Sequence, residues 1–489
     1  MSRTARVFRV PVLVVVVASV VAALVLDRSP SASTVAGAQS ATSGDGASVP
    51  PAAAVSISWF CAEGTSAEGG RADETVVIAS LATQRIDATV TVMPAGNQTP
   101  VSHHVKLAPR SQQRVQISSV LRTAEPGVVV EVVGGQAVVT QELRGNDDVA
   151  IEPCTRRPGT DWYFAAGTSV KGSQQFLVLF NPFGDDAIVD TTLYTDTGVQ
   201  QPDVLQATVV PRRSRVSLPL HDIDPRQERM AVHVHARTGR VVAERTLLFD
   251  GTSPDAGRTR RGLAVSLGAE SPAVVWQLAG GTTEGGGAAA VSIANFGSAE
   301  TTAEVGVLPA DEQSVAPQSV TIPAGGVVSV DVTAHVPADT AFAVTVTSRN
   351  AERITGPVVA ELLAWWPPGS ATRGVATTLG STRPARRWVI PLPAVDSAGL
   401  ITVMNPGTKP ITAALLPAEF VDRPRGATSE PERGVSPQRI ATFRVVRVGD
   451  DGSGALVVTA DRSVIVGFTI TGNVGAAASA AIPDLAYRR

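Results

Sequence analysis

Lysine, cysteine and aromatic side chains are scarce in this 489-residue chain, and its net charge is small. Charged residues make up 17% of it, which is low for a cytosolic enzyme, and the net charge is −3. A chain so close to neutral lacks the basic footprint of a nucleic-acid-binding protein, so we expect no nucleic-acid partner. Three of the 41 basic residues are lysine, a bias typical of a GC-rich genome such as that of an actinobacterium.

Valine, alanine, glycine and proline are abundant instead. Hydrophobic residues make up 44% of the chain, which excludes a wholly disordered protein. Valine suits the half-buried surface of a strand, and 44 glycines and 34 prolines provide frequent turns. The composition therefore predicts an all-β fold, and the length predicts about three to five domains.

The N-terminus predicts export. Met1–Arg9 carries three arginines and no acidic residue, and the apolar run Val10–Leu26 follows. Positive charge before such a run keeps the N-terminus cytoplasmic and places the remainder outside. We favour an uncleaved single-pass signal-anchor over a cleaved signal peptide, because the best cleavage site, Ala36-Gly37-Ala38, lies 12 residues beyond the run. Asp27–Val55, rich in Ser, Ala, Gly and Pro, predicts a disordered stalk.

Four similar segments follow the stalk. Each opens on a tryptophan, at Trp59, Trp162, Trp276 and Trp388. An Asn-containing turn lies 17–19 residues after the last three of these, at Asn181, Asn295 and Asn405. A late strand carries a glutamate in three copies, at Glu142, Glu244 and Glu361. Tryptophan and asparagine at such constant spacing serve packing and turn geometry, so the repeat has a structural meaning.

The domain organisation follows from these repeats. We expect a cytoplasmic N-terminus (1–9), a transmembrane segment or signal peptide (10–26), a stalk (27–55), and repeat 1 (56–157), repeat 2 (158–270), repeat 3 (271–383) and repeat 4 (384–489). Repeat 2 shows about seven or eight short strands between turns, which fits an immunoglobulin-like or fibronectin-like β-sandwich. Because each unit is large enough to close its own core, we expect four tandem sandwiches arranged like beads on a string.

Cys61 and Cys154 are the only cysteines, one near each end of repeat 1. An even count in an exported chain favours a disulfide. A redox-active pair is the alternative, but the Cys-x-x-Cys motif it needs is absent. We therefore predict a structural bridge between these two residues.

Two histidines are the strongest candidates for a metal site. His233 and His235 lie two apart in one strand and so share a face, and His221 could add a third ligand. An ordinary exposed strand face is the favoured interpretation, because the aligned residues of repeat 3 are Thr345 and Thr347. We assign no metal-binding residue.

The recurrent glutamates could be catalytic acids. Glycoside hydrolysis, for example, needs two carboxylates in one cleft, whereas these occur once per repeat in a strand. A structural role, such as a hydrogen bond to an adjacent turn, is favoured. We therefore predict no catalytic residue, no cofactor and no enzymatic activity.

Trp365 and Trp366 form an unusual aromatic pair in repeat 3. An exposed tryptophan pair can stack on sugars or anchor a protein partner, so this pair is a candidate binding surface. Adjacent residues of a strand face opposite ways, however, so one of the two could belong to the core. The insertion Val421–Gln438 in repeat 4 is predicted to be a loop, where binding residues often lie.

Repeat 2, with Trp162-Tyr163-Phe164-Ala165-Ala166-Gly167-Thr168, Phe180-Asn181-Pro182, Pro211 and Val242-Ala243-Glu244-Arg245, resembles an actinobacterial family of exported proteins known only as a domain of unknown function. The resemblance implies an envelope location, a β-rich fold and no assigned activity. Genes of that family often lie near envelope glycosyltransferase genes, so the resemblance implies such an enzyme as one candidate partner.

Three functional hypotheses remain. The leading one is a non-catalytic, membrane-anchored extracytoplasmic scaffold that binds an envelope or membrane protein. The first alternative is a cell-wall polysaccharide-binding protein, which needs exposed aromatic platforms. The second alternative is an envelope enzyme, which needs a cleft with converging carboxylates or histidines. If the leader is cleaved, the protein is secreted rather than anchored.

Overall fold

A computed structural model of the chain describes residues 46–487, apart from 97, 146–147, 253–258, 312–314, 351–355, 368, 371, 395–396, 422–430, 449–453 and 473–474. The predicted membrane segment 10–26, the stalk before residue 46 and most of the repeat 4 insertion lie outside the described residues. Within the part that is described, no helix has the length and apolar character needed to cross a membrane. Nearly all regular structure is antiparallel strand, so the all-β prediction is confirmed.

The first two repeats each contribute two antiparallel sheets. We call the sheet whose last strand lies at the centre of the molecule axial, and the other sheet peripheral. In repeat 1 the peripheral order is β1 (Ser56–Cys61), β6 (Gly127–Val133), β3 (Ile86–Met93), β4 (Val101–Leu107), and the axial order is β5 (Gln112–Gln116), β2 (Asp73–Ser80), β7 (Ala137–Arg144), β8 (Val149–Pro153). In repeat 2 the peripheral order is β9 (Asp161–Phe164), β15 (Met230–Thr238), β11 (Ala187–Thr195), β12 (Gly198–Gln200), with β13 (Thr208–Val210) also on β11, and the axial order is β14 (Ser214–Pro219), β10 (Ser173–Asn181), β16 (Val242–Asp250), β17 (Arg261–Leu267).

The same order recurs in the second half of the chain. In repeat 3 the peripheral order is β18 (Val275–Thr282), β23 (Ala341–Asn350), β20 (Thr301–Pro309), β21 (Gln318–Ile322), and the axial order is β22 (Val327–Asp331), β19 (Ala288–Ala294), β24 (Val359–Trp366), β25 (Gly374–Leu379). In repeat 4 the long strand β31 (Leu456–Gly472) serves both sheets. It pairs with β26 (Ala385–Ile390) and β28 (Ile411–Pro417) in one, and with β27 (Ser397–Asn405) and β32 (Gly475–Ala480) in the other. The outer partners are β29 (Glu432–Val435), β30 (Arg439–Val448) and β33 (Ile482–Pro483).

Helices in the described residues are single turns: α2 (Leu220–Ile223), η1 (Ile117–Ser119), η2 (Asp203–Leu205), η4 (Glu284–Gly286) and η5 (Ala418–Phe420). They connect strands and form no layer of their own. The part of the chain that the structure describes is therefore built from packed sheets alone.

The recurring residues have the packing and turn roles that their spacing indicates. The four opening tryptophans are at most 2% exposed, each in the core between the two sheets of its repeat. In Asn181, Nδ2 donates to the carbonyls of Asp185 and Val210, and Oδ1 accepts from the amide of Phe183. Asn295 and Asn405 make the same pattern of bonds. A buried amide that satisfies three backbone groups explains why this position recurs.

The strand order differs from that of an immunoglobulin domain. There the first strand lies in one sheet with the second, whereas here β1 pairs with β6 and lies in the sheet opposite β2. The equivalent first strands β9 and β18 pair in the same way, with β15 and β23. Two packed antiparallel sheets are thus present in each repeat, with an order of their own.

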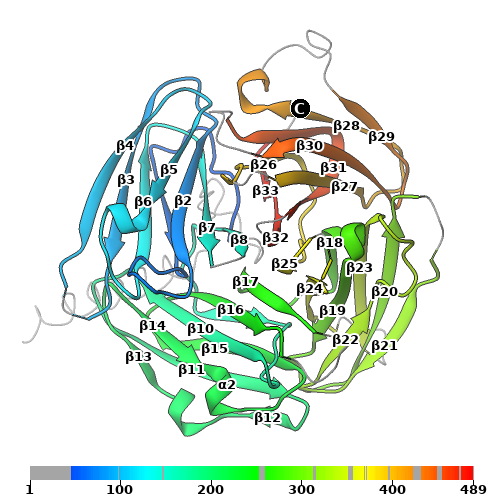
Figure 1. Ribbon diagram of the computed structural model, residues 1–489, viewed down its shortest axis with the longest axis horizontal. Helices are drawn as coiled ribbons and strands as arrows, with labels where there is room; N and C mark the ends of the chain where they lie inside the picture. Colours follow the sequence, from blue (N-terminus) through cyan, green and yellow to red (C-terminus); the bar gives the residue numbers. More distant parts are fainter. Residues whose placement is uncertain are drawn as a thin grey trace, which may run out of the picture. The chain divides into compact units, whose positions relative to one another are not determined.

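The last strand of each axial sheet lies at a common centre (Figure 1). β8 contacts β17, β17 contacts β25, β25 contacts β32, and β32 contacts β8. Three of these strands have a glycine at positive φ as their first or second residue, Gly262, Gly374 and Gly475. A Cβ added to each would lie 2.7–3.0 Å from a backbone nitrogen of the next repeat. Glycine therefore permits the close approach of neighbouring repeats around this axis.

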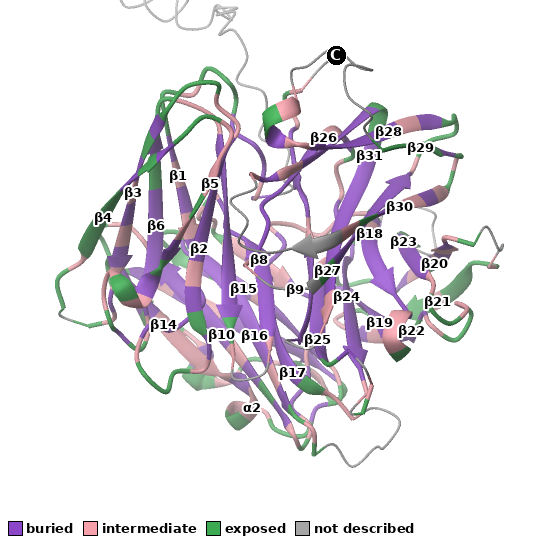
Figure 2. Ribbon diagram, turned by 45° about the horizontal axis from the view of Figure 1, so that its top comes forward, coloured by how far each residue is buried: buried purple, intermediate pink, exposed green. Residues whose placement is uncertain are grey.

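The expected beads-on-a-string arrangement is wrong. Residues Gly44–Arg489 form one compact unit, and the four repeats close on one another. The physical reason lies in the axial strands: every residue of β8 is buried, and β17, β25 and β32 are buried along nearly their whole length. A strand that is apolar on both faces needs cover on both, and the neighbouring repeats provide it. Figure 2 shows the buried centre, with exposed residues on peripheral edge strands such as β4 and β21.

Candidate functional site

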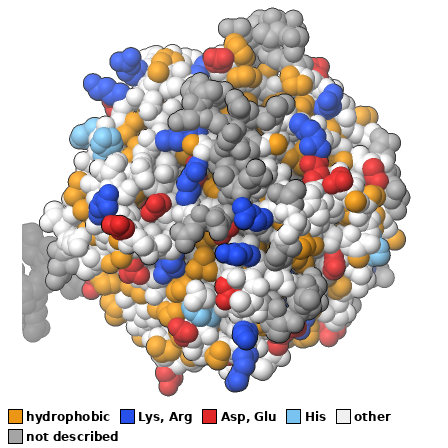
Figure 3. All heavy atoms as spheres, viewed as in Figure 1, with side chains coloured by type: hydrophobic (Ala, Val, Ile, Leu, Met, Phe, Trp, Pro, Cys, Tyr) orange, Lys and Arg blue, Asp and Glu red, His pale blue; other side chains and the backbone are white. Residues whose placement is uncertain are grey.

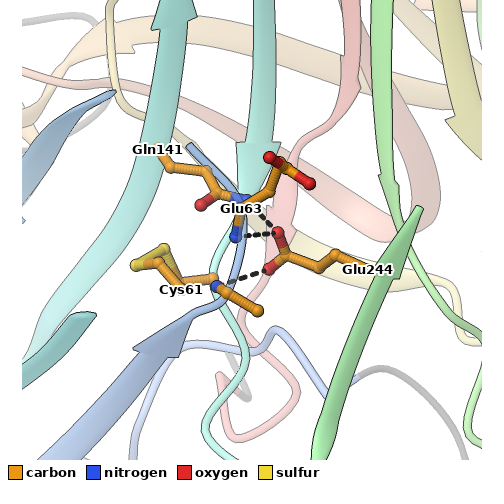
Figure 4. Close-up of a disulfide and its surroundings, with 6 residues drawn as sticks. Cys61, Glu63, Gln141 and Glu244 are labelled. Carbon is orange, nitrogen blue, oxygen red and sulfur yellow. Dashed lines mark hydrogen bonds between the residues drawn. A yellow bond between two sulfur atoms is a disulfide. The ribbon is translucent and has the colours of Figure 1, made fainter. Parts of the chain in front are cut away.

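The recurrent glutamates join neighbouring repeats. Glu244, on β16 of repeat 2, is fully buried and accepts hydrogen bonds from the amides of Ala62 (3.2 Å) and Glu63 (2.9 Å) in repeat 1. Its carboxylate also accepts a bond from Nε2 of Gln141 at 2.5 Å. Figure 4 shows this carboxylate beside Cys61 and the loop that follows it. Glu244 thus binds the loop after the opening tryptophan of the preceding repeat.

The same contact recurs at two other interfaces between neighbouring repeats, and we call these interfaces seams. Glu361 of repeat 3 accepts from the amides of Ala165 (3.1 Å) and Ala166 (2.5 Å) in repeat 2. Glu142 of repeat 1 accepts from the amide of Ala394 (3.0 Å) in repeat 4, which closes the circle. A structural role in bonding a turn is therefore confirmed for these glutamates, with the correction that the turn belongs to the neighbouring repeat.

Repeat 4 lacks the glutamate and closes its seam differently. Thr469 Oγ1 donates to the carbonyl of Gly280 in repeat 3 at 2.5 Å. A Cβ on Gly467 would lie 2.1 Å from the carbonyl oxygen of Ala279, so the two backbones approach as closely as glycine allows. At the fourth seam the backbones of repeats 3 and 4 pack directly against each other, whereas a carboxylate joins the repeats at the other three seams.

Two buried arginines at these seams carry no recurring signature in the sequence. Nη1 of Arg215 donates to the carbonyls of Ala62, Gly64 and Pro126 at 2.7–2.9 Å. Arg245 Nη1 forms an ion pair with Glu361 Oε2 at 2.8 Å, where the side chains are 1% and 0% exposed. Both arginines come from strands of repeat 2 and reach into neighbouring repeats.

Burial dominates the electrostatics of these seams. Burial raises the pKa of Glu244 to about 7, against the lowering effect of its hydrogen bonds from Gln141 and the two amides. Burial likewise raises the pKa values of Glu361, Glu74 and Glu152. These carboxyls therefore favour the protonated form more than exposed ones do.

Replacing Glu244 with glutamine is expected to flatten the dependence of stability on pH. A carboxyl with a pKa of about 7 when folded and 4.5 when unfolded stabilises the fold fully below pH 4.5, and this stabilisation is lost as the pH rises to 7. At about 1.4 kcal/mol per pKa unit, the loss is about 3 kcal/mol. Glu244→Gln should lack this loss when urea unfolding is compared at pH 5 and pH 8.

The glutamine also forfeits an accepted hydrogen bond at every pH, so the difference between the two pH values is the measured quantity. Glu304→Gln, at a residue whose side chain is 52% exposed, is the matched control and should keep the wild-type dependence. A Glu244→Gln protein with the full wild-type pH dependence would contradict the assignment.

The paired histidines meet an aspartate rather than His221. His233 Nε2 lies 3.0 Å and His235 Nδ1 lies 2.9 Å from the same oxygen, Oδ1 of Asp161. The three potential ligand atoms lie within 4.8 Å of one another. His221 instead contacts the carbonyl of Gln175 through Nδ1 (3.1 Å), so it does not supply the third ligand.

Hydrogen bonds favour the ionised form of Asp161. Burial raises the pKa of Asp161, but bonds from His235, His233 and Thr160 outweigh it and hold that pKa below its ordinary value. Burial lowers the pKa of His233, against the raising effect of Asp161. Asp161 is therefore a carboxylate facing two imidazoles. Sequence reasoning missed it, although it directly precedes the opening Trp162 and lies opposite His235 in the register.

The prediction that Trp365 and Trp366 form a binding surface is wrong, because the two side chains are 6% and 1% exposed. Trp366 lies in the core of repeat 3, and its Nε1 donates to the carbonyl of Glu284 at 2.8 Å. Trp365 faces the other way and packs with Phe249 and Leu247 of repeat 2, with the guanidinium of Arg260 4.3 Å from the centre of its ring. Both indoles therefore stabilise the fold.

A small cavity lies where the four repeats meet. Its volume is about 60 Å³, and its lining includes Glu152, Leu267, Trp276 and Trp388. Glu152 Oε1 accepts a hydrogen bond from the amide of Leu267 at 2.9 Å. A drug-sized ligand needs about 300–1,000 Å³, so this space suits a few water molecules.

The predicted disulfide between Cys61 and Cys154 is present. It joins the end of β1 to the segment directly after β8, and both sulfur-bearing side chains are fully buried in the core of repeat 1. Cys61 directly precedes the loop that Glu244 binds. The bridge therefore fixes one side of the seam between repeats 1 and 2.

Comparisons with known proteins find one matching family model, over part of the chain, and no activity. A family model described as "Family of unknown function (DUF5719)" matches residues 119–255, which run from the end of η1 in repeat 1 through most of repeat 2. The match agrees with the predicted resemblance to an uncharacterised family, while the actinobacterial origin stays a prediction. No curated protein matches the chain. A solved structure titled "Crystal Structure of Thermotoga maritima 1070" shows 14% identity over 21% of this chain and 94% of that one, with a TM-score of 0.19, which is too low to support an argument.

Proposed function

We propose that this protein is a non-catalytic scaffold of the cell envelope that presents four closed β-repeats outside the membrane and binds an envelope or membrane protein. In this proposal residues 10–26 form the single-pass signal-anchor. The repeats belong to the wider immunoglobulin-like or fibronectin-like class of sandwiches, with the strand order described above. An envelope glycosyltransferase remains one candidate partner.

The observation that carries the proposal is the use of the recurrent glutamates. The side chains that could have been catalytic acids are buried in the seams, where Glu244, Glu361 and Glu142 bind backbone amides of other repeats. Carboxylates placed in this way join neighbouring repeats into one compact unit. A compact unit with a large peripheral surface suits a scaffold, and the disulfide suits an oxidising compartment.

The surface chemistry favours a protein over an acidic polymer. On the face seen in Figure 3, acidic and basic side chains are interspersed rather than gathered by sign. The polysaccharide alternative depended on Trp365 and Trp366, whose burial removes the aromatic platform it required. The enzyme alternative gains no support from the recurrent glutamates.

Photo-crosslinking in intact cells tests the scaffold. Reactive residues placed singly at Val101, Val204 and Val275, which are 37%, 66% and 42% exposed, sample the periphery of repeats 1, 2 and 3. We expect one position to capture the same membrane or envelope protein repeatedly, because a specific interface covers only part of the surface. The other positions serve as matched controls.

Capture of no partner from any position, with the purified protein retained on cell-wall polysaccharide, would contradict the scaffold and support the first alternative. Capture of cytoplasmic proteins alone would contradict the extracytoplasmic location. Mass spectrometry of the crosslinked species distinguishes these outcomes.

A further inference from the structure

The cluster of Asp161, His233 and His235 has the geometry of a metal site. β9 is the edge strand beside β15, and the register places Asp161 opposite His235 and Tyr163 opposite His233. Because residues two apart in a strand share a face, both imidazoles project on the side of the sheet that carries the aspartate. Alternating with them, Val232 and Val234 are fully buried in the core, which fixes the strand beneath the cluster.

The donor atoms already converge. Both imidazole nitrogens approach Oδ1 of Asp161, at 3.0 Å for His233 and 2.9 Å for His235. With metal–nitrogen bonds of about 2.0–2.1 Å, ligand atoms of a tetrahedral site lie roughly 3.3 Å apart. A cation would take the place of the two N–H protons that now point at the carboxylate. The three ligand atoms lie within 4.8 Å of one another and would close in to that spacing.

Neighbouring groups orient the ligands. Thr160 Oγ1 donates to Oδ2 of Asp161 at 2.9 Å, which leaves Oδ1 facing the histidines. The ring of His233 stacks on Tyr163, with centroids 4.3 Å apart and planes 4° from parallel. Tyr163 is itself held by Phe296 of repeat 3, at 5.0 Å. Support of this kind from surrounding side chains is typical of metal ligands.

The fold does not require these three residues. In repeat 3 the same register positions hold Val275, Thr345 and Thr347. In repeat 1 they hold Ser58, Val129 and Glu131. The equivalent sheets of repeats 1 and 3 therefore form without such a cluster. Of repeats 1, 2 and 3, repeat 2 alone has an aspartate and two histidines at these register positions.

We propose that Asp161, His233 and His235 bind a divalent transition-metal ion such as Zn²⁺. Two imidazoles and one carboxylate are ligands that late first-row metals prefer. The side chains are 32%, 22% and 51% exposed, so water or a solute can reach the remaining coordination positions. The proposal is independent of the scaffold function, and it gives repeat 2 a site whose residues are not repeated in repeats 1 and 3.

Calorimetric titration of the metal-free, full-length protein with Zn²⁺ tests the site. The protein must carry no histidine tag, because the chain has only six histidines of its own. We expect saturable binding of one ion per chain. His235→Ala and Asp161→Asn should each weaken it at least about 100-fold, because even loss of an orienting neighbour typically costs 10–100-fold.

His103→Ala/His104→Ala is the matched control. These two exposed histidines are adjacent on β4 and so point to opposite faces, and their loss should leave binding unchanged. Zn²⁺ should also raise the unfolding temperature of the wild type and of this control, but not that of His235→Ala. Absence of saturable binding in the wild type, or binding that survives His235→Ala and Asp161→Asn, would overturn the proposal.

Discussion

Replacing Arg245 with leucine is expected to lower the free energy of unfolding by about 3–5 kcal/mol. The guanidinium pairs with Glu361 at 2.8 Å and also donates to Ser266 Oγ at 2.8 Å and to the carbonyl of Ala166. Neither charged side chain is more than 1% exposed. Removing the cation leaves a carboxylate and a carbonyl buried without their partner, and water cannot replace it.

A second substitution identifies the cause. Adding Glu361→Gln to Arg245→Leu removes the uncompensated charge but keeps an oxygen for the amides of Ala165 and Ala166. This double variant should recover at least half of the lost stability if the buried charge dominates. Urea unfolding followed by tryptophan fluorescence measures all three proteins.

The matched control is Arg349→Leu. Its partner is Glu304 at 3.2 Å, and the two side chains are 57% and 52% exposed. A surface pair of this kind contributes less than about 1 kcal/mol. An Arg245→Leu protein destabilised no more than Arg349→Leu would contradict the role assigned to the buried pair.

Much of each repeat could be predicted because the signals are local. The strand predicted to carry His233 and His235 is β15, and the short strands expected between turns in repeat 2 are present as β9 to β17. The opening tryptophans and the turn asparagines act within their own repeat, so their spacing along the chain reports their role directly. The two cysteines were paired because no other partner exists for either.

The arrangement around the axis could not be predicted from such signals. It depends on contacts between residues more than 100 positions apart, such as Glu244 with Ala62 and Glu361 with Arg245. The sequence holds a weak signal of this packing. β17, β25 and β32 are rich in glycine, alanine and other small residues, whereas an edge strand exposed to solvent would carry polar residues. Trp365 was misjudged for the same reason, since the residues that cover it belong to repeat 2.

Loss of the disulfide is expected to have an effect of similar size in repeat 1. The bridge joins residues 93 positions apart. A crosslink that closes a loop of this length reduces the entropy of the unfolded chain by an amount worth about 4–5 kcal/mol. Cys61→Ala/Cys154→Ala should therefore unfold at a much lower urea concentration than the oxidised wild type, with a steeper dependence on urea because its unfolded state is more expanded.

Alanine is the substitution of choice because both positions are fully buried and lie in an apolar core. Position 61 corresponds to Phe164 in repeat 2 and Leu278 in repeat 3, where a large apolar side chain fills the space. Wild-type protein unfolded with a reductant present should match the double variant, and the reductant should leave that variant unchanged. Equal stability of the oxidised wild type and the double variant would show that packing alone holds repeat 1 closed, as it does in the three repeats without cysteine.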